Sequence, residues 1–419
     1  MNPTFKIAAA AMMVAGAFAS QAYAAGFQLS EQSAIQMGRA MAGAGVVGDD
    51  LSAVHYNPAG MTLLPGTRMQ ATGTWVAVNL DYEGDSGQKE NGRLKGQMIP
   101  AGFITHQLTD NVWTGLGLTV PYGMGTEYNK NWEGNTRGTE SMILTFDINP
   151  NIAWKVNEKF SVGAGVSLQY AKAKLGMGAY VPMDIGTSTI TLPANAVVKG
   201  DSWAWGWNVG MMFQPVDTVR IGLSYRSSID HDAEGHTDAT VFTPRGTQAM
   251  RSDMKVSLKT PDTITLSATW EATEALRLSG TARWSKWSNF DTLNVRNADF
   301  AGTPMANVQV ENNWNDTWFF SVGADYKIDS QWTVRGGVAY DQGPVDNEYR
   351  VAVIPDTDRV WFSLGTSYKC TNNLTFDFGA TYIKGVGDTD LYKADHKTHL
   401  GEYKSLDSYI FSAQMQYLF

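Results

Sequence analysis

Six histidines are the residues of this chain best suited to acid–base or metal chemistry, at positions 55, 106, 231, 236, 396 and 399. A hydrolase needs a nucleophile beside an oriented base, and no spacing in the sequence indicates a Ser/His/acid arrangement. The pairs His231/His236 and His396/His399 are close enough in sequence to suggest a surface metal, but they lie in polar stretches that we expect to be solvated loops. We therefore expect no catalytic residues, no metal and no cofactor.

Three arginines could instead bind the carboxylate of an amphiphilic ligand, because a guanidinium pairs with a carboxylate through two hydrogen bonds. Arg226, Arg283 and Arg335 alternate with apolar residues, so in a strand they share a face with small polar neighbours. The same face carries acids such as Asp325 and Asp377, which offer each arginine a partner within the protein.

The N-terminus predicts export from the cytoplasm. Lys6 precedes an apolar run over residues 7–19, and Ala22-Tyr23-Ala24 has the small-x-small pattern of a signal peptidase site. We expect residues 1–24 to be a signal peptide and the mature chain to begin at Ala25. Removing Lys6, the only charge in that segment, takes the net charge from -9 to -9 - 1 = -10, so nucleic acid is not an expected partner. The single cysteine, Cys370, cannot form an internal disulfide.

Composition and alternation predict a transmembrane β-barrel. The chain has 43% hydrophobic and only 17% charged residues, with 42 Gly and 14 Trp. Long series of segments alternate apolar and polar residues, as strands do when one face meets lipid and the other a lumen. The last segment, residues 409–419, places Tyr409, Phe411, Met415, Tyr417 and Phe419 on one face and ends on an aromatic residue.

The connections between these segments alternate in length. Short links fall near residues 109–110, 156–158, 215–216, 272–274, 329–330 and 371–372, and long polar or Gly-rich stretches fall near residues 85–93, 121–139, 175–198, 230–250, 289–310, 343–356 and 385–403. Seven long loops and six short turns predict an all-β antiparallel barrel of about 14 strands over residues 67–419, with the short turns in the periplasm.

Residues 25–66 do not fit this pattern, and we call them the plug. They are rich in Gly and Ala and carry three candidate helix starts, at Ser30, at Asp49-Asp50 and at Asn57-Pro58. A segment of this size cannot bury a core alone, so we expect it to fold as a small, partly helical hatch inside the barrel.

The signal peptide, the start Ala25-Gly26-Phe27, the plug closing on Asn57-Pro58-Ala59, the Pro121-Tyr122-Gly123 stretch and about 14 strands together resemble the FadL family. Members are outer-membrane transporters of long-chain fatty acids and other hydrophobic compounds in Gram-negative bacteria. The resemblance covers the whole mature chain, and it implies a monomer whose partners are hydrophobic small molecules and outer-membrane lipid.

The resemblance also implies a route. Cargo would bind an extracellular apolar groove, pass to a pocket near Phe27, and leave sideways beside an inward kink in the third strand, residues 111–120. We expect this kink at Gly115 and Gly117, with Asn57, Pro58 and Ala59 bracing the plug nearby. Both glycines could instead serve only close packing.

Apolar residues in the stretch that follows Leu175 favour a hydrophobic cargo. Met177, Val181 and Met183 lie in a predicted extracellular loop, where exposed apolar side chains usually mark a binding surface, although they could also pack on a neighbouring loop. Aromatic hydrocarbons remain an alternative to fatty acids. A general diffusion porin and a lipid hydrolase are less favoured, because of the plug and the missing nucleophile.

Overall fold

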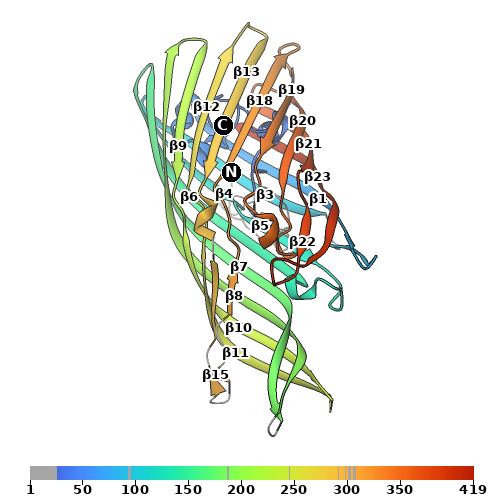
Figure 1. The fold of residues 1–419 in the computed structure, drawn as a ribbon. Helices are drawn as coiled ribbons and strands as arrows, with labels where there is room; N and C mark the ends of the chain where they lie inside the picture. Colours follow the sequence, from blue (N-terminus) through green and yellow to red (C-terminus); the bar gives the residue numbers. More distant parts are fainter. Residues whose placement is uncertain are drawn as a thin grey trace.

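The computed structural model describes residues 26–92, 96–185, 188–244, 246–290, 292–297, 299–300, 303–304 and 308–419, so the expected signal peptide lies outside the described residues. One antiparallel sheet curls round until its first long strand, β1 (Thr67–Gly84), pairs with its last, β23 (His399–Leu418). The predicted closed 14-stranded barrel is confirmed (Figure 1).

Between β1 and β23, the remaining wall strands are β3 (Gln97–Thr109), β4 (Val112–Thr119), β6 (Glu140–Asn157), β7 (Phe160–Ile185), β8 (Ser188–Val216), β9 (Val219–Arg226), β12 (Thr263–Glu271), β13 (Leu276–Ser285), β18 (Thr317–Lys327), β19 (Trp332–Asp341), β20 (Asp358–Lys369) and β21 (Leu374–Val386). Shorter or extramembrane strands are β2 (Lys89–Asn91), β5 (Gly123–Glu127), β10 (Asp230–Thr243), β11 (Gly246–Lys259), β14 (Thr292–Asn297), β15 (Asp299–Phe300), β16 (Thr303–Pro304), β17 (Val308–Glu311) and β22 (Asp390–Tyr392). Single 3₁₀ turns are η2 (Asn135–Arg137), η3 (Trp287–Phe290) and η4 (Asn347–Tyr349). None of the helices in the described ranges is long and apolar enough to span a membrane.

Alternation sorts the side chains of the wall as the sequence predicts. On β8, Trp203, Trp205 and Trp207 are exposed, whereas the intervening Ala204 and Asn208 are buried. The predicted outward faces at Tyr409 and Phe411 are likewise exposed. The wall therefore presents an apolar surface to lipid and a mixed surface to the lumen.

Two predicted loops are strands in the structure. β7 and β8 pair without interruption from Phe160↔Phe213 to Ile185↔Ser188, and β10 pairs with β11 from Asp230↔Lys259 to Thr243↔Gly246. These hairpins project beyond the rest of the barrel, at the end opposite the short turns (Figure 1). The prediction of a loop over residues 175–198 was wrong, because an antiparallel hairpin can continue to pair above the membrane, where its strands meet water.

The plug fills the lumen at the end with the short turns. It contains α2 (Ala34–Gly38), α3 (Ala53–Tyr56) and the 3₁₀ helix η1 (Pro58–Leu63). The predicted cap at Asn57 is confirmed, since its side chain accepts a hydrogen bond from the Ala59 N–H. The first helix begins later than the prediction at Ser30, because Ser33 rather than Ser30 caps it.

Wall glycines form a seat for this plug. A Cβ added to any of eight of them would lie within 2.9 Å of a plug atom, where no real Cβ fits: Gly115, Gly163, Gly210, Gly222, Gly323, Gly337, Gly365 and Gly379. Together they come from β4, β7, β8, β9 and β18 to β21, so the plug touches most of the circumference. Missing side chains let its main chain approach the wall directly.

A buried ionic network holds the same seat. Arg39 of the plug, with no exposed side-chain surface, lies 2.6 Å from Asp49 and 3.2 Å from Asp325 of β18. Arg335 of β19 completes the pairing with Asp325 at 2.9 Å. Removing one partner of such a buried pair typically costs about 3–5 kcal/mol, so the network resists displacement of the plug.

We predict that Gly337→Ala destabilises the protein and that Gly336→Ala does not. The new Cβ of residue 337 would lie 2.3 Å from the Arg39 carbonyl oxygen, whereas that of residue 336 would be 3.5 Å from its nearest neighbour. Overpacking of this kind costs about 1–3 kcal/mol in the free energy of unfolding, measurable by denaturant titration in micelles. Equal unfolding midpoints for the two variants would contradict the seat.

Candidate ligand-binding site

An apolar pocket with a volume of about 60 Å³ lies where the long hairpins meet the barrel mouth. Its aliphatic walls come from many strands and one loop: Ile143, Ala171, Ala173, Leu175, Met177, Val198, Ala233, Met254, Val256, Leu258, Val295, Val351, Val353 and Ile354. Burying such surface stabilises an apolar ligand by about 25 cal/mol per Å² removed from water. The arrangement suits a hydrophobic molecule.

Met177 therefore lies where a binding residue was predicted, although on a strand and half-buried rather than in an exposed loop. Val181 and Met183 continue the same strand, and their side chains lie outside the described part of the structure.

Phe27, predicted to lie near the ligand pocket, packs beside this apolar pocket, and its contact with cargo stays a prediction. Its ring is fully buried in an aromatic cluster, with centroid distances of 4.8 Å to Trp287, 5.3 Å to Phe290 and 5.8 Å to Tyr122. Because Phe290 also lines the pocket, the start of the plug packs against the lining of the pocket.

The segment that carries Phe27 acts as an added strand. The Leu29 N–H donates to the Pro121 carbonyl oxygen at 2.8 Å, and the Gly123 N–H donates to the Phe27 carbonyl oxygen at 2.9 Å. The Gly26 N–H donates to a carboxylate oxygen of Asp356 at 2.8 Å. Burial raises the pKa of the Asp356 carboxyl to about 6, opposed by the nearby Arg359 guanidinium and by the Gly26 hydrogen bond. Ionised at neutral pH, this carboxylate makes the stronger, charge-assisted bond to Gly26.

These contacts coincide with a break in the wall. The ladder between β3 and β4 ends at Gly102↔Leu118, and β5 pairs along its length with β6. Leu29, Ile99 and Val120 belong to one apolar cluster at this break. We call this break in the wall the lateral opening, and the plug covers its inner side.

Gln32 substitutes for the missing strand partner. Its amide nitrogen donates to the Val120 carbonyl oxygen at 2.8 Å, and its amide oxygen accepts from the Val120 N–H at 3.4 Å. A backbone group left unpaired in a membrane wall would cost several kcal/mol, so the fully buried Gln32 stabilises the closed arrangement.

The inward kink predicted at Gly115 and Gly117 is at the wrong place. Both residues sit in regular ladders with β3 and with β6, and the break begins only after Thr119. A Cβ on Gly115 would lie 2.5 Å from Met61, so that glycine serves the seat. The break is marked instead by Pro121, which has no N–H to donate, and by neighbouring main chain that bonds to the plug rather than to β3.

Asn57, Pro58 and Ala59 brace the plug, but not against the third strand. The Asn57 side-chain amide donates to the Met211 carbonyl oxygen on β8, and Pro58 approaches Gly163 on β7. The prediction of contact with the third strand was wrong. A helix cap, readable from the sequence, fixes the direction of the chain, but the sequence does not show which wall strand the capped turn contacts.

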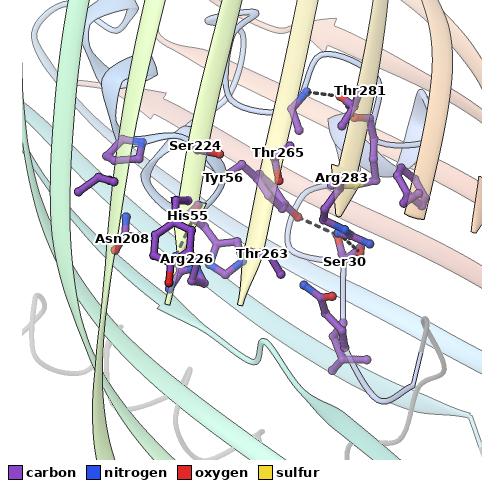
Figure 2. Close-up of a pocket in the computed structure, with 18 residues that line it drawn as sticks. Ser30, His55, Tyr56, Asn208, Ser224, Arg226, Thr263, Thr265, Thr281 and Arg283 are labelled. Carbon is purple, nitrogen blue, oxygen red and sulfur yellow. Dashed lines mark hydrogen bonds between the residues drawn. The ribbon is translucent and has the colours of Figure 1, made fainter. Parts of the chain in front are cut away.

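The three arginines point inward, as alternation predicts, but none of them lines the apolar pocket. Arg226 and Arg283 line a separate polar cavity of about 40 Å³ beneath Phe27, where Figure 2 shows Arg283 turned toward Ser30. Arg335 borders a third cavity near the short turns. Arg226 is paired with Asp147, and Arg335 with Asp325, so contact with cargo stays a prediction.

Residues that sequence reasoning missed are Gln32, the aromatic cluster partners Trp287 and Phe290, and His231. His231 was placed in a solvated loop, but it is 1% exposed on β10. The sequence did contain a signal for this: His231 and Ala233 are two residues apart, so on a strand their side chains would share one face.

Comparisons place these features among known proteins. A family model described as "Outer membrane protein transport protein (OMPP1/FadL/TodX)" matches residues 15–419. Outer membrane protein P1 of Haemophilus influenzae is 31% identical, over 90% of this chain and 89% of its own. The long-chain fatty acid transport protein of Escherichia coli O6:H1 is 29% identical, over 90% of each. The crystal structure of a Pseudomonas aeruginosa FadL homologue superposes with a TM-score of 0.84 at 26% identity, over 94% of this chain and 100% of that chain.

We predict that Phe27→Ala loosens the start of the plug. Truncating a packed Phe costs about 3–5 kcal/mol, so the Leu29 amide should exchange with deuterium at least about 100-fold faster. Hydrogen exchange with mass spectrometry measures this directly. Phe320→Ala is the matched control, because that ring is exposed on the outer wall. Unchanged exchange in the Phe27 variant would show that the aromatic cluster does not hold the segment.

Proposed function

The chain belongs to the OMPP1/FadL/TodX family of outer-membrane transport proteins, and from this premise we propose that it takes up long-chain fatty acids by lateral exit into the outer membrane. Members of the family carry hydrophobic compounds across the outer membrane as channels, not as enzymes. In this proposal residues 25–66 are the plug, residues 67–419 are the barrel, and the protein works as a monomer.

The observation that carries the proposal is the shared use of residues 26–32. The same segment covers the apolar pocket with Phe27 and closes the lateral opening with Leu29 and Gln32. A ligand that displaces Phe27 therefore also loosens the closure of the wall. Binding and opening become one event.

The seat argues against passage straight through the lumen. Eight glycines and the Arg39 network hold the body of the plug by close packing, in five cases against its main chain, and by buried charge. The segment before Ser33, in contrast, is attached mainly by single hydrogen bonds and apolar contacts. A net hydrogen bond contributes only about 0.5–1.5 kcal/mol, which binding of an acyl chain can offset.

The exit then leads from one apolar environment to another. Ile99 and Val120 face the lumen side of the opening, and the outer surface beside it carries exposed Met98. An acyl chain moving along these residues need not cross water, which is the main barrier to releasing a hydrophobic cargo.

We predict that tying the two edges of the lateral opening together abolishes uptake while leaving binding intact. If the ladder continued past Gly102↔Leu118, Pro100 and Val120 would be partners in it, so we place cysteines there in a Cys370→Ser background. A short bis-maleimide joins them. Uptake of a labelled long-chain fatty acid is measured in cells that lack other such channels.

The matched control joins Ile104→Cys to Leu116→Cys, a pair inside the intact part of the same ladder. Uptake should survive there. Transport at the original rate through a protein fully cross-linked at 100 and 120 would refute lateral exit. If the unmodified protein took up a labelled aromatic hydrocarbon but not the fatty acid, the proposed cargo would change and the proposed route would stand.

A further inference from the structure

A chain of three polar side chains borders the largely apolar pocket, whose other polar lining residues are Lys172 and Asn312. His231 at the start of β10 is buried, with Nδ1 at 3.0 Å from the Ser202 hydroxyl oxygen on β8 and Nε2 at 3.0 Å from the Gln169 amide oxygen on β7. Ser202 and His231 both line the pocket. Neither is accounted for by the route proposed above.

The partners fix the direction of these hydrogen bonds. An amide oxygen only accepts, so the His231 Nε2–H donates to Gln169, and in the neutral ring Nδ1 is then an acceptor. The Ser202 hydroxyl must donate its single proton to that nitrogen. What Ser202 offers the pocket is consequently an oxygen lone pair, which accepts a hydrogen bond and cannot give one.

The ionisable residues around the pocket also favour a ligand that donates a hydrogen bond over one that carries a negative charge. Among its described lining residues only Lys172 and His231 are ionisable, and the Lys172 side chain is exposed, alternating with the inward-facing Ala171 and Ala173. Arg226, Arg283 and Arg335 lie in other cavities. An ionised carboxylate would enter without a buried cation and would meet the oxygen of Ser202, which is costly.

Resting on the proposed function, we propose that this pocket selects uncharged amphiphiles that carry a hydroxyl donor, meaning long-chain alcohols or fatty acids in their protonated form. Ser202 accepts the hydrogen bond of the ligand head group. His231 is a positioning residue that holds the Ser202 proton away from the pocket, and Gln169 holds the ring.

The test compares C12 probes on the full chain in detergent micelles at pH 8, by equilibrium dialysis with blank micelles subtracted. The probes are 1-dodecanol, dodecyl methyl ether, which lacks the donor, and laurate, which is ionised. We expect dodecanol to bind about 3- to 10-fold more tightly than the ether, as one net hydrogen bond gives, and more than 10-fold more tightly than laurate.

Variants separate the roles. Ser202→Ala should make dodecanol and the ether bind alike, with apolar binding retained. His231→Leu should do the same by freeing the Ser202 hydroxyl to rotate, whereas His231→Gln, which can still accept from Ser202, should restore the preference. A purely structural role for His231 would change the affinities for alcohol and ether together.

Laurate binding at pH 8 as tightly as dodecanol in the unmodified protein would overturn this inference and leave the proposed function standing. Equal binding of alcohol and ether would overturn it also. Failure of all three probes to bind would overturn the proposed function itself, because the pocket would then not take acyl chains.

Discussion

Every main-chain N–H and C=O in a membrane wall must find a partner, and this requirement governs the structure around residues 119–123. There the strand leaves its neighbour β3, and the plug supplies the partners instead: Leu29 and Phe27 through their main chain, and Gln32 through its amide. A wall that depends on the plug for its hydrogen bonds cannot be understood apart from it. Residues 26–32 of the plug consequently lie both at the opening and beside the pocket.

The plug divides into a fixed body and a weakly held beginning. The body lies against glycines on eight strands and carries the fully buried Arg39 between Asp49 and Asp325. The beginning is held by the aromatic cluster around Phe27 and by a bond from Gly26 to Asp356. In the function proposed above, this difference in attachment lets one segment of about 40 residues both block the lumen and respond to a ligand, as cooperative units of unequal stability do.

Sequence alone predicted the barrel well, because alternation and loop length are local signals that each strand repeats. It expected Phe27 near a pocket because an aromatic residue follows the cleavage site on a segment too small to fold alone, and it singled out Met177 as an apolar residue in a predicted loop; both lie at or beside the apolar pocket. It could not place the break in the wall, since the hydrogen-bond partner of Val120 there is Gln32 of the plug, 88 residues away in sequence. It also misplaced His231, because a hydrophilic stretch, DHDAEGHTDA, reads as a loop although its inner face is buried in the hairpin.

Lateral exit, as proposed, requires that the body of the plug stays in its seat during transport. Thr62 of the plug and Ser161 of β7 are 3.0 Å apart at their hydroxyl oxygens, so a Thr62→Cys/Ser161→Cys pair in the Cys370→Ser background can be oxidised to tie plug to wall. Uptake of a labelled fatty acid, with and without reductant, is the measurement. We predict equal rates for the oxidised and reduced protein. A rate that falls on oxidation and returns on reduction would show that the plug must move, and would contradict the account.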